Sequence, residues 1–411
     1  MSELKTLVAA TRRLEQNGES FLLATVVRTH GASYRHEGAR LIIDRDGRGT
    51  GSISGGCLEA DLQRRGWWRT EGHGPVVLTY DSRPEEGDDE VGWGLGLGCQ
   101  GAVELLLETI APGMPIHPLR FIEGCLEKGQ RGAIATVFRS DCPEVPLGAR
   151  LTRDAHGEIL CDIVIPGIRS ALAAVAEKVL STGRTLCHVH DCHGGSIEAL
   201  VDVIVPPPHL WLFGVGPDAV SVLTMARSIG WTLSICGRQA RWQTRERFAS
   251  ADHLYLGPIE AAAAACGACD QSFAIVMSHD YEQDRGTLRA LLSTPVRYIG
   301  VLGPRQRTLR LLADLKRAGW VPTRADAHRL HAPIGLDLGA ETSHEIVLAV
   351  ISEIQAVRAG ASAAFLRNRF GRIHSNSART QEGPFVPEES SPFEGDLSCL
   401  LASPAMADQS L

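Results

Sequence analysis

The sequence predicts an α/β protein with two dissimilar halves. The N-terminal half is expected to be α+β with a duplicated β unit, and the C-terminal half a doubly wound, mostly parallel sheet. The chain of 411 residues is too long for one core of ordinary size. Three prolines at 206–208 form a stiff extended connector where the patterning changes. Beyond them, apolar runs alternate with helical segments, which indicates βαβ units.

Shifts in composition set the predicted domain boundaries. We place a glycine–cysteine domain at 1–115, a second β unit at 116–205, the proline linker at 206–208 and the doubly wound domain at 209–370. Residues 371–411 are rich in Ser, Pro and Glu and lack periodicity, so a flexible tail is expected there.

Composition limits the partners and the compartment. The formal net charge of -7 argues against a nucleic-acid or membrane partner. No apolar run approaches the roughly 18–20 residues of a spanning helix, and the N-terminus is typical of an amphipathic helix rather than a signal peptide. We therefore expect a cytoplasmic protein. In that compartment, most of the 11 cysteines should be small buried hydrophobes rather than a disulfide framework.

An internal repeat predicts the duplication in the first half. ATV at 24–26 recurs at 135–137, and GARL at 38–41 recurs at 148–151. Each copy has the pattern of a strand, a loop with Gly or Pro, a second strand and an acidic turn. The second copy has no equivalent of SGGC at 54–57, so that feature is an addition to the scaffold.

Two glycine-flanked cysteines are the strongest candidates for chemistry in this half. Cys57 follows Gly55 and Gly56 and precedes a helical segment, and a helix N-terminus favours the ionised form of a thiol. Cys99 follows Gly98 at the end of GWGLGLGC, where alternating glycines leave room for a ligand or a second backbone. The alternative is that both cysteines pack beside glycines in a tight core.

A dinucleotide-type fingerprint opens the second half. GVGPDA at 214–219 follows the first strand and begins a helix, with Gly214, Gly216 and Ala219 in the small positions. The helix N-terminus would offer free N–H groups and a positive dipole to a phosphate. This predicts a Rossmann-like domain with a cofactor site. The alternative is a tight strand–helix turn without a ligand.

Other strand ends should meet the same crevice, because ligands of doubly wound sheets bind beyond the carboxyl ends of the strands. The second strand ends in Gly237-Arg238 instead of an acidic residue, which disfavours NAD and makes Arg238 a candidate for a 2′-phosphate or another anion. Ser278, His279 and Arg305 follow later strands, with His279 the best acid/base or phosphate-contacting candidate. Helix capping, with His279 merely exposed, is the alternative.

Three weaker signals complete the set. The loop at 30–35, HGASYR, could add polar groups to the pocket of Cys57. The CHVHDCH run at 187–193 has metal-binding residue types but no further ligand pair, so no metal site is predicted. Cys266 and Cys269 have redox spacing without a second pair.

These motifs resemble the XdhC/CoxI accessory proteins of molybdenum hydroxylases. The similarity extends in order over roughly residues 5–370. The segments that carry it are GASYRHEGARLIIDRDGRGTGSISGGCLEADL, GLGLGCQGAVELLLE, LFGVGPDAVSVLTMARSIGW, IVMSHDYEQD, YIGVLGPRQRTLRLL and HAPIGLDLGAETSHEIVLAVISEIQAVRAG.

The resemblance implies a non-catalytic maturation factor. Such proteins bind molybdenum cofactor, as molybdopterin or its dinucleotide form, favour the sulfurated form and insert it into a xanthine dehydrogenase-like enzyme. A cysteine desulfurase takes part in that step, and we expect a homo-oligomer. By position, Cys57 and Cys99 become sulfur- or molybdenum-handling candidates, while Gly214, Gly216 and His279 fall in the nucleotide-fold motifs. Where the family has an acidic residue and an Arg, this chain has Gly237 and Gln239.

Two other functions stay open at this point. The fingerprint at 214–219 is compatible with an NAD(P)-dependent oxidoreductase, although the sequence after the second strand weakens that interpretation. Cys266 and Cys269 are compatible with a thiol redox protein. The accessory function ranks first because its motifs are the more restrictive.

Overall fold

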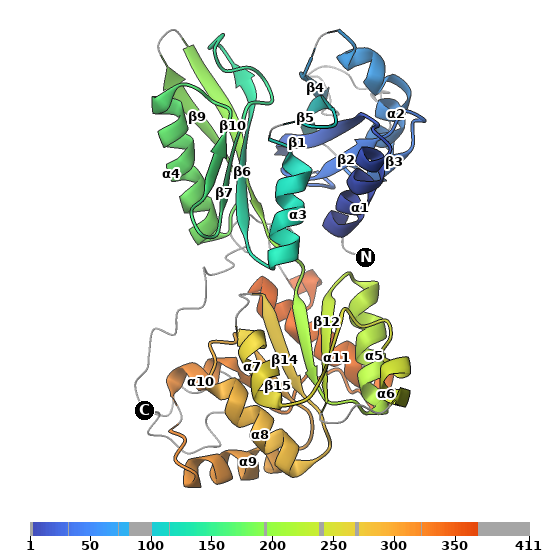
Figure 1. The fold of residues 1–411 in the computed structure, drawn as a ribbon, viewed down its shortest axis with the longest axis vertical. Helices are drawn as coiled ribbons and strands as arrows, with labels where there is room; N and C mark the ends of the chain where they lie inside the picture. Colours follow the sequence, from blue (N-terminus) through green and yellow to red (C-terminus); the bar gives the residue numbers. More distant parts are fainter. Residues whose placement is uncertain are drawn as a thin grey trace. The chain divides into compact units, whose positions relative to one another are not determined.

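The computed structural model describes residues 3–368 except 32, 73, 82–100, 115, 193–194, 238–241, 268–270 and 322. The chain forms two compact units, one over Glu3–Val205 and one from Pro206 onward (Figure 1). The predicted fold class is confirmed, with antiparallel sheets in the first unit and a parallel sheet in the second. No helix within the described ranges is long and apolar enough to cross a membrane.

The first unit repeats one topology twice. The first copy contains α1 (Glu3–Gln16), β1 (Phe21–Gly31), β2 (Arg40–Ile43), β3 (Gly49–Gly51), α2 (Cys57–Thr70), β4 (Val76–Asp81) and β5 (Gly101–Ile110). The second copy contains α3 (Pro118–Lys128), β6 (Gly132–Ser140), β7 (Arg150–Asp154), β8 (Ile159–Cys161), α4 (Pro166–Thr182), β9 (Leu186–Cys192) and β10 (Gly195–Ile204).

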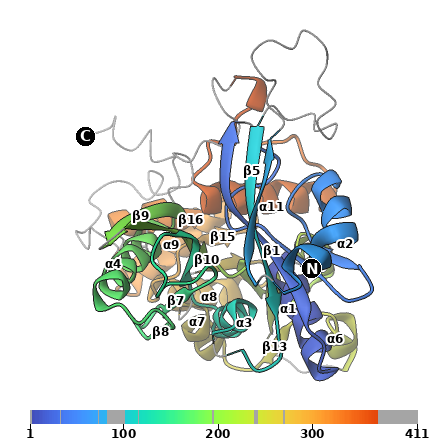
Figure 2. The ribbon, with the colours of Figure 1, turned by 90° about the horizontal axis from the view of Figure 1, so that it is seen from above.

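The two antiparallel sheets have matching strand orders, β3-β2-β1-β5-β4 and β8-β7-β6-β10-β9. Helix α2 packs on the first sheet and α4 on the second (Figure 2). The duplication therefore includes helices that the sequence repeat did not reveal.

The two sheets pack together at a seam, and each copy has a β-bulge at the same place in this seam. The register of β1 against β5 shifts at Val27, and that of β6 against β10 shifts at Phe138. A bulge re-aims a side chain, and here both bulged residues pack with Leu106 and Leu200 in one small cluster of buried side chains. The seam core thus takes equivalent residues from each copy.

Two buried ion pairs cross this seam and explain the repeated GARL motif. Arg40 of the first copy binds Asp202 of the second at 2.9 Å, and Arg150 binds Glu108 in the reciprocal pair. Each arginine comes two residues after a glycine with a positive φ, Gly38 in the first copy and Gly148 in the second. A Cβ on Gly38 would lie 2.6 Å from the Asp202 carboxylate, so the glycine makes room for the partner of the arginine.

The second unit is the doubly wound domain. It contains β11 (His209–Phe213), α5 (Pro217–Ser228), β12 (Thr232–Gly237), α6 (Trp242–Arg247), β13 (His253–Leu256), α7 (Ile259–Gly267), β14 (Ser272–Val276), α8 (Tyr281–Leu292), β15 (Ile299–Val301), α9 (Arg305–Arg317), α10 (Arg324–Arg329), β16 (Leu330–His331), α11 (Ser343–Ala359) and a short 3₁₀ helix (Leu366–Asn368). The parallel strands lie in the order β13-β12-β11-β14-β15-β16. The order reverses between β11 and β14, which is where such sheets bind ligands.

We predict that breaking one buried ion pair is costlier than removing it whole. Glu108→Leu leaves the Arg150 guanidinium unpaired and should lower the free energy of unfolding by about 3–5 kcal/mol. The double variant Glu108→Leu/Arg150→Met should recover most of this loss. Urea unfolding followed by circular dichroism measures both.

The pair of the half-buried Arg153 and the exposed Glu177 provides the control. Glu177→Gln should change stability by less than about 1 kcal/mol. A double variant that is no more stable than Glu108→Leu would show that the charges themselves are required.

We also predict a pH-dependent stability from His117. Its Nδ1 accepts from the Leu119 and Arg120 amides at the start of α3, and burial lowers the pKa of His117 to about 4 despite the nearby Glu15 carboxylate. The unfolded chain therefore binds the extra proton between pH 6.5 and about 4. Over that window stability should fall by up to about 3 kcal/mol as pH falls.

The control is His117→Asn, which keeps a capping oxygen and cannot titrate. Thermal unfolding across this pH range should show a smaller slope for the variant than for the wild type. Equal slopes would assign the pH dependence to other groups.

Candidate functional site

The SGGC segment is a short turn that Glu59 holds in place. One oxygen of its carboxylate, Oε1, accepts from the Ile53 and Ser54 amides at 2.9 and 2.8 Å, and the other, Oε2, accepts from the Gly56 amide at 3.1 Å. The Ser54 hydroxyl also donates to Glu59. Burial acts to raise the pKa of Glu59, but these hydrogen bonds outweigh it and the pKa lies below the ordinary value. The turn is therefore bound to a carboxylate that stays ionised.

Cys57 begins helix α2 and its side chain is exposed. Gly56 precedes it as the N-cap with φ 123°, a conformation that residues with a Cβ rarely adopt. Gly55 has no positive φ, and a Cβ there would meet nothing within 4 Å. Gly56 is thus required by the shape of the turn, whereas Gly55 is not required by its backbone conformation or by close packing.

The topology of the first sheet brings several loops to the end that carries this turn. The Ser52 amide donates to the Arg40 carbonyl where β2 begins. Strand β1 ends at Gly31, which pairs with Gly101 at the start of β5. Helix α2 begins at Cys57, whereas the apolar run after Cys99 is strand β5.

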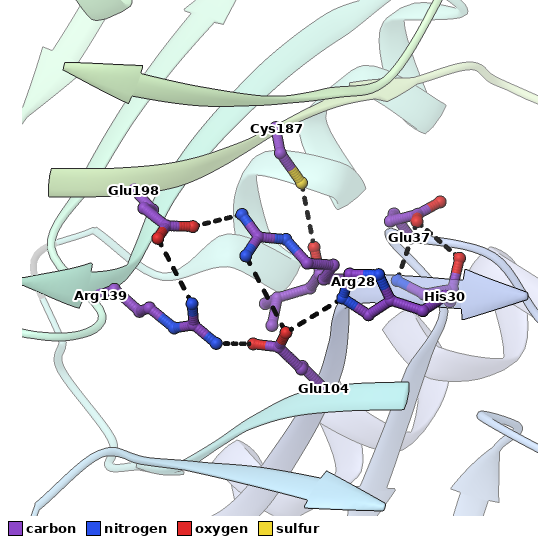
Figure 3. A network of polar contacts seen from close by, with 9 residues as sticks. Arg28, His30, Glu37, Glu104, Arg139, Cys187 and Glu198 are labelled. Atoms are coloured by element: carbon purple, nitrogen blue, oxygen red, sulfur yellow. Dashed lines mark hydrogen bonds and ion pairs between the residues drawn. The ribbon is translucent and has the colours of Figure 1, made fainter. Parts of the chain in front are cut away.

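A polar network lies at the seam near the end of β1 (Figure 3). Arg28 pairs with Glu198 from the second copy, and Arg139 pairs with Glu104 from the first at 2.6 Å. His30 Nε2 lies 3.5 Å from Glu104, and its side chain is about half exposed. The sequence predicted polar groups in the loop after β1, but nothing in it linked them to β5 or β10.

The network also contains an unpredicted thiol. Cys187 Sγ lies 3.3 Å from the Val27 carbonyl oxygen, to which it donates (Figure 3). Desolvation raises the pKa of Cys187, with Arg28 opposing the effect. Further along the same CHVHDCH run, Cys192 forms a disulfide with Cys142. This pair is an exception to the expectation that most cysteines are small buried hydrophobes, because only the tertiary fold brings the two sulfurs together.

The fingerprint glycines of the second unit have different roles. A Cβ on Gly214 would lie 2.4 Å from the Met277 carbonyl oxygen, so the first turn requires glycine for close packing on β14. Gly216 is the N-cap of α5 and has an ordinary negative φ. Ala219 is fully buried in the core. Gly214 and Ala219 are thus explained by packing alone.

Asp218 lies in the first turn of α5, at the helix end that would face a pyrophosphate. Its carboxylate accepts from Ser343 Oγ at 2.8 Å, and its other oxygen lies 3.6 Å from His279 Nε2. His279 itself has φ 62° and a largely exposed side chain. The helix terminus therefore already has an anionic group of this chain beside it.

The remaining predicted rim residues do not all converge. Ser278 donates to the buried carboxylate of Asp284, which also binds Arg307 at 2.8 Å. Asp280 caps α8. Arg305 is exposed at the first position of α9. Ser278 is thus part of a structural ion-pair cluster, whereas His279 faces Asp218.

Gly237 at the end of β12 is tightly packed, since a Cβ there would meet the Val215 side chain at 2.7 Å. The acidic residue typical of NAD-binding sites would not fit at 237 without a shift of Val215. Cys266 is buried in α7. The predicted residues Gly98, Cys99, Arg238 and Cys269 lie outside the described residues.

Comparisons with known proteins assign the chain to a family. The family described as "XdhC and CoxI family" matches residues 14–81, and "XdhC Rossmann domain" matches residues 210–354. The chain belongs to the XdhC/CoxI family of xanthine dehydrogenase accessory proteins.

Particular relatives agree with this assignment. The chain is 28% identical over 346 residues to a probable xanthine dehydrogenase subunit from Bacillus subtilis, covering 84% of this chain and 95% of that protein. It is 22% identical over 348 residues to "Molybdenum cofactor insertion chaperone PaoD" of Escherichia coli, covering 83% and 85%. A crystal structure described as a xanthine dehydrogenase from Bacillus halodurans shares the fold, with TM-score 0.64, 23% identity and 89% and 98% coverage.

The turn before Cys57 gives a direct test of the local geometry. Gly56→Ala should lower the free energy of unfolding by about 1–3 kcal/mol because its φ is unfavourable for alanine. Gly55→Ala is the matched control and should stay within about 0.5 kcal/mol. Urea unfolding compares the two; equal losses would contradict the conformation described for Gly56.

Proposed function

We propose that this chain binds molybdenum cofactor, supports its sulfuration and inserts it into a xanthine dehydrogenase-like molybdenum hydroxylase. Family membership and the likeness to a protein named as a molybdenum cofactor insertion chaperone support the proposal. The observation that carries it furthest is the exposed Cys57 thiol, presented on a turn that Glu59 and Gly56 hold.

The donor set fits the cofactor. A thiolate is a soft ligand that suits molybdenum or sulfur rather than a hard cation such as Mg²⁺. When bound, the cofactor supplies the molybdenum centre and its pterin. The sulfur of Cys57 would bind molybdenum or a sulfur atom of the cofactor. Glu59 would hold the turn that presents this thiol. Cys99 is proposed as a second sulfur- or molybdenum-handling residue on the basis of the family motif.

The second unit carries candidate cofactor-binding residues of its own. We propose His279 as a cofactor contact at the rim of the parallel sheet, with Gly216, Ser278 and Arg305 on the neighbouring strand–helix turns. Arg238 is proposed from the sequence as an anion contact. Neither unit needs to catalyse a reaction for this function, so the chain would act as a maturation factor.

The proposed partners follow from the same function. They are a molybdenum hydroxylase that receives the cofactor, a cysteine desulfurase that supplies sulfur, and a second copy of this chain. The cytoplasm is the proposed compartment, because all three would meet there.

The alternative is an NAD(P)-dependent oxidoreductase that uses the GVGPDA turn. Two observations weigh against it: Asp218 puts a carboxylate in the first turn of α5, and position 237 is a glycine at which a side chain would require Val215 to shift. Titration with NADPH, followed by fluorescence, should show no saturable binding. Tight binding with hydride transfer would favour the oxidoreductase.

The proposal predicts that Cys57 is required for enzyme activation. In a strain that lacks its own copy, Cys57→Ser should lower hydroxylase activity by at least about tenfold relative to the wild-type chain, because serine is a poor soft-atom ligand. Cys161→Ser is the matched control, since Cys161 is a free, half-buried cysteine of the second copy.

Protein levels are compared by immunoblotting, so that loss of the chain is separated from loss of function. Full activation by Cys57→Ser at normal protein level would contradict the role given to this thiol.

A further inference from the structure

A cavity of about 160 Å³ lies beneath the carboxyl ends of the parallel sheet. Its walls are apolar side chains from α5, β14 and α11, including Val222, Ile275 and Val350. Met277 and Leu302, which follow β14 and β15, complete its upper part. The cavity thus lies beside β14, on one side of the reversal in strand order.

Among the described residues that line the cavity, two have polar side chains. Asp218 comes from the first turn of α5, and Ser343 begins α11. The Ser343 hydroxyl donates to Asp218 Oδ1, so what this pair offers a ligand is mainly acceptor capacity. Asp218 Oδ2 lies 3.6 Å from His279 Nε2, which is beyond hydrogen-bond distance. A ligand therefore meets a carboxylate that can still accept hydrogen bonds.

This charge decides the kind of ligand. A phosphate at the start of α5 would lie close to the Asp218 carboxylate, and the two negative charges would repel each other. A neutral ring that carries N–H donors would satisfy the carboxylate and place its faces on the aliphatic walls. The cavity volume is close to the roughly 150 Å³ of an engineered cavity that binds benzene, so one six-membered ring fits.

We propose that this cavity binds a 2-amino-4-oxopyrimidine ring, with Asp218 accepting hydrogen bonds from the ring N–H and the 2-amino group. Two adjacent donors on one edge match the two oxygens of a carboxylate. Pterins and guanine share this edge, so either could supply the ring. The pterin source rests on the proposed function, because molybdenum cofactor contains a pterin.

The 2-amino group of the ring determines the predicted specificity. Inosine monophosphate lacks the 2-amino group, so part of the Asp218 carboxylate would stay unpaired in its complex. Guanosine monophosphate should bind the full chain at least about tenfold more tightly than inosine monophosphate, and adenosine monophosphate should not bind. Calorimetric titration of the three nucleotides measures this order.

A titration with 6-hydroxymethylpterin tests whether the ring comes from a pterin or from guanine. The fluorescence of this pterin reports its binding. Binding of the pterin together with guanosine monophosphate, or of either alone, supports the shared ring chemistry and names the source. Equal affinity for guanosine and inosine monophosphates would overturn the proposal, as would absence of binding by both the pterin and guanosine monophosphate.

The key variant is Asp218→Asn, which replaces one acceptor by a donor that opposes the ring N–H. It should weaken binding of the ring at least about tenfold. Asp280→Asn is the matched control, because it makes the same change at the N-cap of α8, where asparagine also caps well. Val222→Phe fills the cavity without changing charge and should also abolish binding. Binding unchanged in Asp218→Asn and Val222→Phe would overturn the proposal.

Molybdenum content of the purified chain distinguishes this proposal from the proposed function. If the chain holds molybdenum but binds neither the pterin nor guanosine monophosphate, the ring site is wrong and the proposed function stands. If the chain binds the ring through Asp218 but never holds molybdenum, the ring site stands and the proposed function is wrong.

Discussion

The two reciprocal ion pairs across the seam, Arg40 with Asp202 and Arg150 with Glu108, are the constraint on which the first unit depends. All four side chains are almost fully buried. A buried charge without its partner is strongly destabilising, so each sheet needs the other in one register. The bulges, the positive-φ glycines and the seam core are all placed relative to these pairs. These ion pairs therefore also fix the position of the sheet end that presents Cys57.

The function we propose uses the differences between the two copies. The first copy has His30 and Glu37 at the seam, where the second has Asp141 and Leu147. It also begins its sheet-covering helix with an exposed cysteine, whereas α4 begins with Pro166. A duplicated scaffold with one copy modified gives a rigid support for a few chemical groups. Stability comes from what the copies share, and the proposed chemistry from what they do not.

Much of the fold could be predicted because local patterns determine it. Strand–helix alternation after the prolines predicted the parallel sheet, and the GARL repeat predicted the duplication. The same alternation does not identify the strands at 253–256 and 330–331 or the helices at 259–267 and 324–329, because these elements are short and weakly periodic. The seam could not be predicted, since its partners, such as Arg28 and Glu198, are far apart in the sequence.

The candidate site was predictable in part for the same reason. The local signal of SGGC placed Cys57 at a helix start, and the structure agrees. The fingerprint at 214–219 predicted a turn that suits a phosphate, but no sequence rule showed that Asp218 would turn back toward Ser343 and His279. Cys187 and the disulfide of Cys142 with Cys192 depend on contacts between distant strands. Which side chains meet at the ends of loops depends on the tertiary fold, and local sequence patterns do not determine it.

The central claim is that this chain holds molybdenum cofactor. The most direct measurement is the content of the full chain purified from cells that make the cofactor, with molybdenum determined by elemental mass spectrometry and pterin by the fluorescence of its oxidised form. We predict molybdenum and pterin in equal amounts. Recovery of neither, or of a nicotinamide dinucleotide in their place, would contradict the claim.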